Sequence, residues 1–446
     1  MFTSLREWIS FLKENNMISE IKKKVSINFE IAGVTKLYDG EKACLFNNVD
    51  GFEMPVISNA VYDRESIAVS VGSNKENLVS KFLDSMEVPI KCEMSSNVAP
   101  FKQNLLLGDE VDLLKLPIPI HHEKDGGRYI TAGLLIVKDI STGKQNVSIH
   151  RLQVFNKNEM GILILPRHLW HIFSKYEKEQ KELDIAICIG NAPALMLASQ
   201  AITPYGVDEL EIANALLNNN LKLSKCETVN VDVPENTEIV IEGKLIPGMR
   251  KEEGPFGEFP RYYGPAGNRP VIKVTAVGYR NDALYHTILP GTKEHLLLGG
   301  IAREASMIKT ISHTVPSVKG VHLTFGSSCR YHAIVSIKKE HEGEGKNTIL
   351  AAFSNSHEVK QVIVVDDDID IFDHDRVEWA VATRFQAGKD MIVVKGSLGS
   401  KLDPSSDEGI SDKVGMDATL PIKRDNNKFD VMTIPGLDVM KKEDYI

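Results

Sequence analysis

Residues 251–264 restrict the local backbone more than any other segment, because acidic and aromatic side chains alternate there with closely spaced glycine and proline. Glycine and proline disfavour regular secondary structure, so we expect the segment to be neither helix nor strand. A stiff loop of this kind holds the carboxylates of Glu253 and Glu258 in fixed positions, as a general acid and its orienting partner require. The alternative, a surface turn with solvated glutamates, is weakened by polar clusters elsewhere in the chain.

A second group of functional side chains lies upstream, between apolar runs at 130–137 and 161–165. Its polar members are followed by Gln153 and alternate with their neighbours along the chain: Asn146, Val147, Ser148, Ile149, His150 and Arg151. This alternation predicts one strand with two functional faces.

Three further polar residues stand at the starts of two predicted helices. Arg167 and His168 follow a proline, and Glu209 precedes a run of small and apolar residues. The amide oxygen of Asn146, the imidazole of His168 and the carboxylate of Glu209 form a ligand set that suits Mn²⁺ or Mg²⁺ better than structural zinc. Taken alone, His168 is an ordinary histidine at a helix N-terminus, and only the ordered trio favours metal binding.

In this order, the residues resemble the UbiD family of decarboxylases, which use prenylated FMN. The resemblance spans roughly residues 5–420. It implies that Asn146, His168 and Glu209 bind a divalent ion, Mn²⁺ or Mg²⁺, with K⁺ as a further candidate ion. It also implies that Arg151, Glu253 and Glu258 are catalytic.

The same resemblance implies a set of cofactor-binding residues: Asn146, Ser148, Ile149, His150, Arg151, Gln153, Arg167, His168 and Lys413. Lys413 precedes a Val-Gly-Met-Asp-Ala-Thr segment and is expected to contact the cofactor phosphate. The flavin would accept the electrons released as CO2 departs, which side chains alone cannot do. Arg151 would pair with Glu253 and orient Glu258, and Glu258 would protonate the product carbon.

The segment that resembles the substrate-lining part of the family contains His295 and Arg303, eight residues apart. This spacing is about two helical turns, so both side chains can face one pocket. The pairing resembles the branch that decarboxylates furandicarboxylate. An alternative of equal weight is a salt bridge between Arg303 and Glu304 at a domain interface.

The leading hypothesis is a reversible, non-oxidative decarboxylase of a small aromatic, heteroaromatic (furoate or furandicarboxylate type) or α,β-unsaturated acid. Alternatives are a hydroxybenzoate-type decarboxylase, a decarboxylase of anhydromevalonate phosphate, and a non-catalytic flavin-binding subunit of a carboxylase complex. A phosphorylated substrate needs additional cations in the pocket, and the sequence shows no convincing cluster of them. A redox flavoprotein is weakly supported, because no nicotinamide-binding fingerprint is present.

The composition fits a globular, cytoplasmic protein of two or three domains. The chain has 446 residues, 42% of them hydrophobic, which is enough for several cores. No apolar run is long enough to span a bilayer. The net charge of -9 and the dispersed lysines and arginines argue against nucleic acid as a partner. The five cysteines have no paired spacing, so neither disulfides nor a zinc site is expected.

Residues 3–16 have the spacing of an amphipathic opening helix, and the chain then predicts a strand at 43–46 and a helix over 73–83. We predict a mixed α/β fold with three parts. These are an N-terminal α/β domain (1–115), a central catalytic domain with a split-β-barrel-like flavin-binding sheet (116–304), and a C-terminal α/β oligomerisation domain with a tail (305–446). Asp366–Asp370 are expected to cap the helix that follows them. The resemblance further implies a homodimer or homohexamer, and a flavin prenyltransferase as the supplier of the cofactor.

Overall fold

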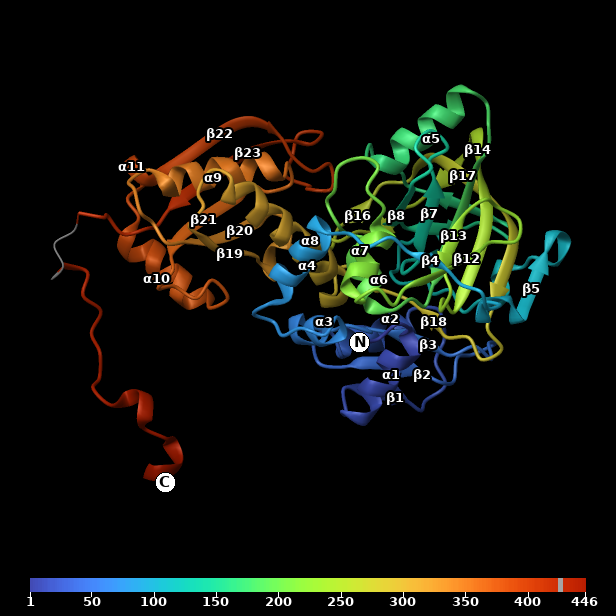
Figure 1. The fold of residues 1–446 in the computed structure, drawn as a ribbon, viewed down its shortest axis with the longest axis horizontal. Coiled ribbons are helices and arrows are strands. Elements are labelled where there is room, and N and C mark those ends of the chain that lie inside the picture. Colours follow the sequence, from blue (N-terminus) through green and yellow to red (C-terminus); the bar gives the residue numbers. More distant parts are fainter. Residues whose placement is uncertain (424–427) are drawn as a thin grey trace.

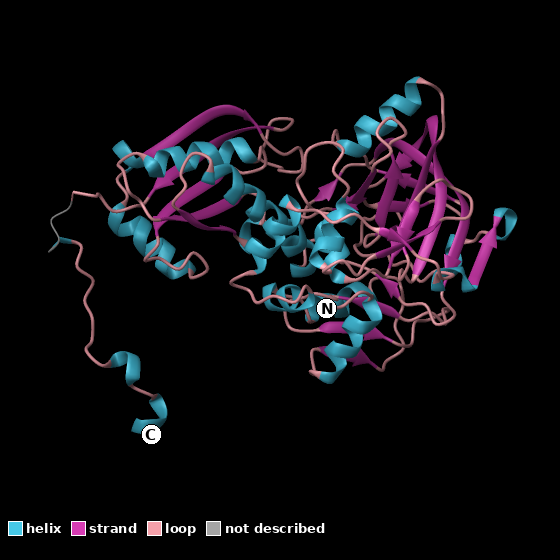
Figure 2. Cartoon of the chain, in the orientation of Figure 1, coloured by secondary structure: helices cyan, strands magenta, loops and turns pink. Residues whose placement is uncertain are grey.

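The computed structural model describes residues 1–423 and 428–446. It contains strands and helices in three main sheets, arranged as an N-terminal unit, a large central sheet and a separate C-terminal unit (Figures 1 and 2). The predicted mixed α/β fold in three parts is confirmed.

The N-terminal unit is a four-stranded sheet in the order β1-β2-β3-β18. Its opening helix is amphipathic as predicted: Ser4 caps the first turn, and Leu5, Trp8 and Leu12 are buried. The helix predicted for 73–83 begins later, because the Asn74 side chain accepts a hydrogen bond from the amide of Asn77 and holds a turn there. The elements are α1 (Leu5–Glu14), β1 (Ile18–Ile21), α2 (Glu30–Leu37), β2 (Ala43–Phe46), β3 (Val56–Ser58), α3 (Arg64–Ser70), α4 (Leu78–Glu87) and β18 (Tyr285–His286).

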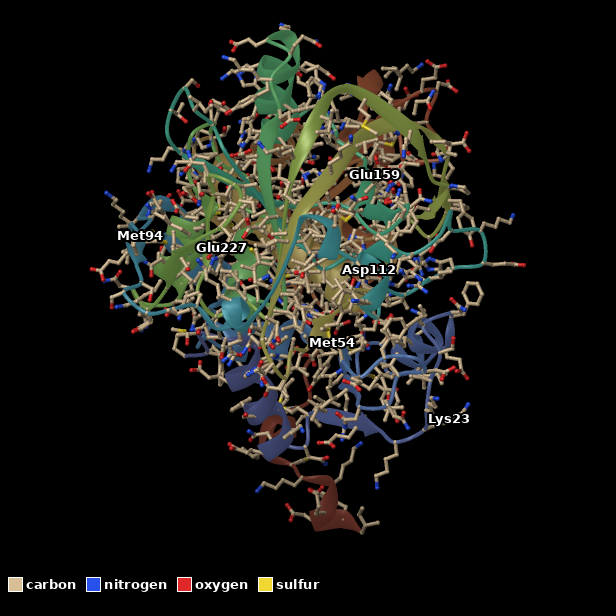
Figure 3. The ribbon with its side chains drawn as sticks, turned by 90° about the vertical axis from the view of Figure 1, so that its right-hand side faces the viewer. Lys23, Met54, Met94, Asp112, Glu159 and Glu227 are labelled. Atoms are coloured by element: carbon tan, nitrogen blue, oxygen red, sulfur yellow. The ribbon has the colours of Figure 1, made fainter. Side chains whose placement is uncertain are left out.

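The central sheet has nine strands in the order β6-β9-β10-β17-β14-β11-β7-β8, with β5 paired to β17. Apolar clusters bury both faces. The strands are β5 (Asn104–Leu107), β6 (Tyr129–Ile130), β7 (Leu134–Lys138), β8 (Gln145–Ile149), β9 (Leu152–Val154), β10 (Glu159–Ile162), β11 (Leu183–Ile189), β14 (Ile239–Glu253) and β17 (Gly267–Tyr279). Figure 3 views this sheet from the side opposite the C-terminal unit, with Glu159 of β10 near the long strands β14 and β17.

Short helices and strands flank this sheet and carry several candidate site residues. They are β4 (Glu93–Met94), α5 (His168–Lys178), α6 (Pro193–Ala198), α7 (Glu209–Leu216), β12 (Lys222–Lys225) and β13 (Asp232–Pro234). The long helix α8 (Lys293–Ser312) then leads from the central region into the C-terminal unit. It packs against α4 and α6 on one side and against β19 and α9 on the other (Figure 1). Because α8 touches all three units, its side chains can couple the central site to the C-terminal unit.

The C-terminal unit is a five-stranded sheet in the order β19-β20-β21-β23-β22. The prediction that Asp366–Asp370 cap the next helix is wrong. Asp373 caps α10 instead, and Asp366 and Asp368 pair with Arg384 near the end of that helix. The elements are β19 (Val318–Leu323), β20 (His332–Ile337), α9 (Glu344–Asn355), β21 (Gln361–Asp366), α10 (His374–Arg384), α11 (Ala387–Asp390), β22 (Met391–Leu398) and β23 (Ile410–Asp417).

Residues 428–446 extend away from the C-terminal unit (Figure 1). They expose several apolar side chains, including those of Met432, Ile434 and Val439. In the described ranges, no helix is both long and apolar enough to cross a membrane.

Candidate active site

The acidic segment closes the end of the long β14–β17 hairpin. The prediction that 251–264 contains no strand is wrong in part: β14 continues to Glu253, and β15 (Phe256–Gly257) pairs with β16 (Tyr263–Gly264). The irregular turns fall at the glycines and prolines. Gly254 adopts a φ of +98°, and a side chain there would collide with the backbone of Ala266. The two acids therefore sit on either side of a sharp corner at the end of a rigid hairpin.

Arg151 brings the two acids together. Its Nη2 lies 2.8 Å from Oε2 of Glu253, and its Nη1 pairs with Oε1 of Glu258. The guanidinium also lies 5.2 Å from the centre of the Phe256 ring. Its Nε is buried and has no hydrogen-bond partner within the described residues, so one donor of this group remains available for a bound molecule.

The strand predicted for residues 146–153 is two strands. Residues up to Ile149 form β8, which pairs with β7, whereas β9 begins at Leu152 and pairs with β6 and β10. His150 and Arg151 lie at the bend between them. The bend explains why Arg151 can reach both acids instead of following the alternation of the strand.

His150 and Ser148 are linked to each other and to the backbone. The Ser148 hydroxyl lies 2.9 Å from His150 Nε2, and His150 Nδ1 lies 3.2 Å from the carbonyl oxygen of Leu163. Burial lowers the pKa of His150 to about 4, so its ring is neutral near pH 7. Ile149, at the end of β8, is half-buried.

Two residues that the sequence did not single out support Glu253 and its loop. The Tyr129 hydroxyl lies 3.1 Å from Oε1 of Glu253 and 3.1 Å from Oε1 of Gln153. Asp125 accepts a hydrogen bond of 2.8 Å from the amide of Gly257. Gln153 itself accepts from the amide of Gly254 and donates to the carbonyl of Gly126, so its polar atoms hold the acidic loop in place.

Burial raises the pKa of Glu258, although Arg151 acts in the opposite direction. The neighbouring side chains of Phe256 and Phe259 are buried, as expected for an apolar surrounding. A carboxyl group with a raised pKa in such a place can carry a proton closer to neutral pH than an ordinary glutamate can.

The structure brings Asn146 and Glu209 into contact. Asn146 Nδ2 donates to Oε1 of Glu209 at 3.1 Å, and the amide of Val147 donates to Oε2 at 2.7 Å. Burial raises the pKa of Glu209 to about 8. His168, the first residue of α5, lines the same small cavity as Asn146.

These three residues fit a divalent ion by their donor chemistry. Asn146 Oδ1 is buried and has no hydrogen-bond partner in the described part of the chain, which leaves a hard oxygen donor beside a carboxylate and an imidazole. No group of three His, Cys, Asp or Glu side chains that could hold a metal occurs among residues 1–423 and 428–446. The trio differs from such a group because one of its donors is an amide.

Lys413 and Arg167 lie on different units of the fold, Lys413 on β23 and Arg167 directly before α5. Lys413, on β23, is buried, and its Nζ donates to the carbonyls of His357 and Val359 at 2.8 and 2.7 Å. Burial lowers its pKa to about 8. Arg167, next to His168, is partly exposed, and burial of its guanidinium together with the nearby Arg303 lowers its pKa. Contact of either residue with a cofactor phosphate stays a prediction.

The other two predicted residues, His295 and Arg303, lie on the buried side of α8. Arg303 does not pair with Glu304, which binds Arg64 instead; its Nε lies 3.1 Å from Oε2 of Glu358. Burial, together with Arg330 and Arg303, lowers the pKa of His295 to about 3, so this residue is a neutral donor or acceptor and not a cation.

Arg330 is a buried cation that the sequence analysis missed. Its Nη1 donates to the carbonyl of Cys329 at 3.0 Å, and its guanidinium lies 5.4 Å from the centre of the Phe259 ring. Burial and the nearby Arg303 lower its pKa to about 9. No sequence motif marks it, because its contact with Phe259, the neighbour of Glu258 in the chain, arises only when the C-terminal unit packs against the acidic loop.

Comparison with known proteins identifies the class of enzyme. Three family models match consecutive parts of the chain: the 3-octaprenyl-4-hydroxybenzoate carboxy-lyase N-terminal domain (residues 9–86), Rift-related domain (93–293) and C-terminal domain (296–418). The chain belongs to the UbiD family and is a carboxy-lyase. The resemblance inferred from the ordered motifs is confirmed.

Individual relatives are similar over almost their whole length. Anhydromevalonate phosphate decarboxylase from Methanothermobacter thermautotrophicus is 37% identical over 419 residues, covering 94% of this chain and 97% of the relative. The UbiD-class enzyme HmfF from Pelotomaculum thermopropionicum, solved in complex with FMN, is 53% identical with a TM-score of 0.97, covering 99% of this chain and 100% of its own. An evolved dimeric form of HmfF with prFMN is 51% identical with a TM-score of 0.94, covering 100% of both chains.

Proposed function

We propose that this chain uses prenylated FMN to decarboxylate, reversibly and without net oxidation, a small unsaturated acid that carries a second carboxylate, of the furan-2,5-dicarboxylate type. The observation that carries the proposal is the Arg151 bridge between Glu253 and Glu258 beside the buried Arg303 and Arg330.

Asn146, His168 and Glu209 would hold the divalent ion, Mn²⁺ or Mg²⁺, which would supply positive charge for the cofactor phosphate. Their donor set and the unpartnered Asn146 Oδ1 support this assignment. Arg167 and Lys413 add positive charge on the phosphate side. When bound, prenylated FMN supplies the electron sink for the departing CO2. FMN and prFMN in the two HmfF structures support the choice of cofactor.

Glu258 delivers the proton that replaces CO2. Its raised pKa lets it hold a proton while Arg151 keeps its carboxyl group in position. Glu253, held by Tyr129 and Arg151, balances the charge of the guanidinium. The surrounding aromatic side chains exclude water, which strengthens these interactions.

The buried charge beside Glu258 favours a second carboxylate on the substrate. Arg167, Arg303 and Arg330 carry three positive charges and Glu358 one negative charge, while His295 is neutral, so the cluster has a net charge of about +2. A second carboxylate on the substrate would offset part of this charge. A buried charge without a partner is costly, so an acid with no second anionic group would bind less well.

A second candidate is the phosphorylated substrate named for the relatives at 37 and 38% identity, anhydromevalonate phosphate. Arg330 supplies the additional cation that the sequence analysis could not find. A phosphate dianion would also be balanced by this cluster, because Arg167 already lies close enough to interact with Arg303, Arg330 and Glu358. Charge alone therefore does not separate the two substrates, and the dicarboxylate is preferred because the pairing of His295 with Arg303 resembles the branch that decarboxylates furandicarboxylate.

The test is CO2 release by protein produced together with a flavin prenyltransferase, which supplies the cofactor. Furan-2,5-dicarboxylate, 2-furoate, a hydroxybenzoate and anhydromevalonate phosphate would be compared at equal concentration. We expect the highest kcat/KM for the dicarboxylate. A preference for the phosphate would replace the proposed substrate by the second candidate. No CO2 from any acid, with matured cofactor present, would favour the non-catalytic subunit.

We also propose that the region after residue 305 makes the protein a homodimer or a homohexamer. The exposed apolar side chains of the 428–446 tail support this, together with those of Met391 and Val393 on the edge strand β22. Light scattering at micromolar concentration should give a multiple of 49.5 kDa, and deletion of residues 428–446 should reduce it. A full-length monomer would contradict the proposal.

A further inference from the structure

One wall of the cavity lined by Asn146 and His168 consists of residues that have no role in the function proposed above. This wall is the segment between α6 and α7, where Tyr205, Gly206 and Val207 line the cavity. The space between these residues is about 10 Å³, room for about one water molecule or a small ion. Tyr205 therefore lies directly beside any ion that Asn146 and His168 would bind.

Tyr205 packs edge-on against the ring of His168. The ring centres are 5.5 Å apart, and the ring planes meet at 84°. The same tyrosine contacts His171, one helical turn further along α5, with ring centres 4.9 Å apart. Across the described ranges, aromatic contacts rather than hydrogen bonds hold the His168 ring. A metal-binding histidine is usually oriented by a hydrogen bond to its second ring nitrogen, so the aromatic contact takes that place.

Tyr205 is itself fixed at its hydroxyl end. The hydroxyl donates to Oδ2 of the buried Asp139, and Lys175 Nζ lies 3.1 Å from the same hydroxyl. Ser141 also donates to Asp139, at 2.7 Å. Burial alone would raise the pKa of Asp139, but the hydrogen bonds from Tyr205 and Ser141 outweigh it and lower the pKa to about 2. Asp139 is thus a charged anchor at neutral pH, and the ring has little freedom to turn.

We propose that Tyr205, anchored by Asp139, is the positioning residue for His168, holding the imidazole in the orientation in which it binds the divalent ion. This inference rests on the proposed metal assignment. Loss of an orienting partner typically weakens metal binding by about 10- to 100-fold. Tyr205 does not contact the reacting atoms, so its effect should appear first in metal affinity and only through it in turnover.

The test measures Mn²⁺ affinity by electron paramagnetic resonance on the FMN-loaded chain, with FMN release followed by fluorescence. Tyr205→Ala removes the ring and should weaken Mn²⁺ binding by about tenfold or more. Tyr205→Phe keeps the ring but removes its hydrogen bond to Asp139, and Asp139→Asn keeps the ring but weakens that hydrogen bond. Both variants should lose less Mn²⁺ affinity than Tyr205→Ala. Tyr262→Phe, at an exposed tyrosine on the acidic loop, is the matched control and should not change the affinity.

His168→Ala separates this inference from the metal assignment. If His168→Ala loses Mn²⁺ and Tyr205→Ala does not, the positioning role is wrong and the metal assignment stands. If His168→Ala itself keeps normal Mn²⁺ affinity, both are wrong. Equal losses in Tyr205→Phe and Tyr205→Ala would overturn the role of the ring. Should Tyr205→Ala fail to fold, unchanged affinity in both Tyr205→Phe and Asp139→Asn would overturn the proposal.

Discussion

The acid network of Arg151, Glu253 and Glu258 and the cavity lined by Asn146 and His168 differ in how many of their polar atoms are paired within the protein. In the acid network, Arg151 already pairs with Glu253 and Glu258, and all three side chains are largely buried. In the cavity, Asn146 Oδ1 has no partner among the described residues, and the His168 ring is held only by aromatic contacts. The protein thus preorganises the groups that we propose for proton transfer, whereas the cavity keeps an unsatisfied oxygen donor, as expected of a site that binds a cation.

The largest expected effect comes from removing the proton donor. Glu258→Gln keeps the size and the contact with Arg151 but cannot deliver a proton, so turnover should fall by about a hundredfold or more. Flavin and metal content should remain, because the change lies outside the cavity. Turnover and deuterium incorporation from heavy water would be measured with matured cofactor. Near-normal values for both would move the donor role to Glu253 or His295.

The next largest effect is expected from removing a proposed metal ligand. His168→Ala or Glu209→Ala should reduce Mn²⁺ affinity by about 10- to 100-fold, with flavin lost in parallel. Both variants should remain folded, and an unchanged thermal melting curve would confirm this. Metal analysis and flavin absorbance of the purified proteins give the result, and unchanged content of both would show that the trio is not the metal site.

The pH dependence of turnover should follow Glu258. The acid must be protonated to act, so activity is present below its folded-state pKa and is lost as the pH rises through it. Because burial raises this pKa, the decline should begin above the pH at which an ordinary glutamate ionises, and it should approach tenfold per pH unit. A rate independent of pH from 4 to 8 would contradict this assignment.

The sequence predicted the parts of the site that lie close together in the chain. The corner at Gly254 and Pro255 and the acids beside it were readable because glycine and proline act locally. The contact between Glu253 and Arg151 was predicted only from the resemblance to the UbiD family. Tyr129 and Arg330 could not be predicted, because they reach the acidic loop only through the pairing of β6 with β9 and the packing of the C-terminal unit.

In the fold, too, the elements set by local sequence were predicted and those set by long-range pairing were not. The opening helix and the strand Ala43–Phe46 were predicted from local periodicity and are confirmed. The bend at His150 and Arg151 was missed, because alternation of side chains cannot show that two consecutive strands pair with different neighbours. The helix cap was assigned to Asp366–Asp370, but Asp366 and Asp368 pair with Arg384 and Asp373 caps α10.

The smallest predicted effect concerns Tyr129, which supports the acid network of Arg151, Glu253 and Glu258 from outside. Tyr129→Phe removes a hydroxyl that lies 3.1 Å from Glu253, at a cost of about 1 kcal/mol, or roughly fivefold in turnover. The hydroxyl helps to hold the Glu253 carboxylate beside Arg151, and the negative charge of Glu253 contributes to the raised pKa of Glu258. A displaced Glu253 carboxylate should therefore move the alkaline decline of activity to lower pH. Tyr285→Phe is the matched control, because Tyr285 is equally buried and its hydroxyl has no partner in the described residues. A fall in turnover without a shift of the pH profile would mean that Tyr129 only packs against the loop.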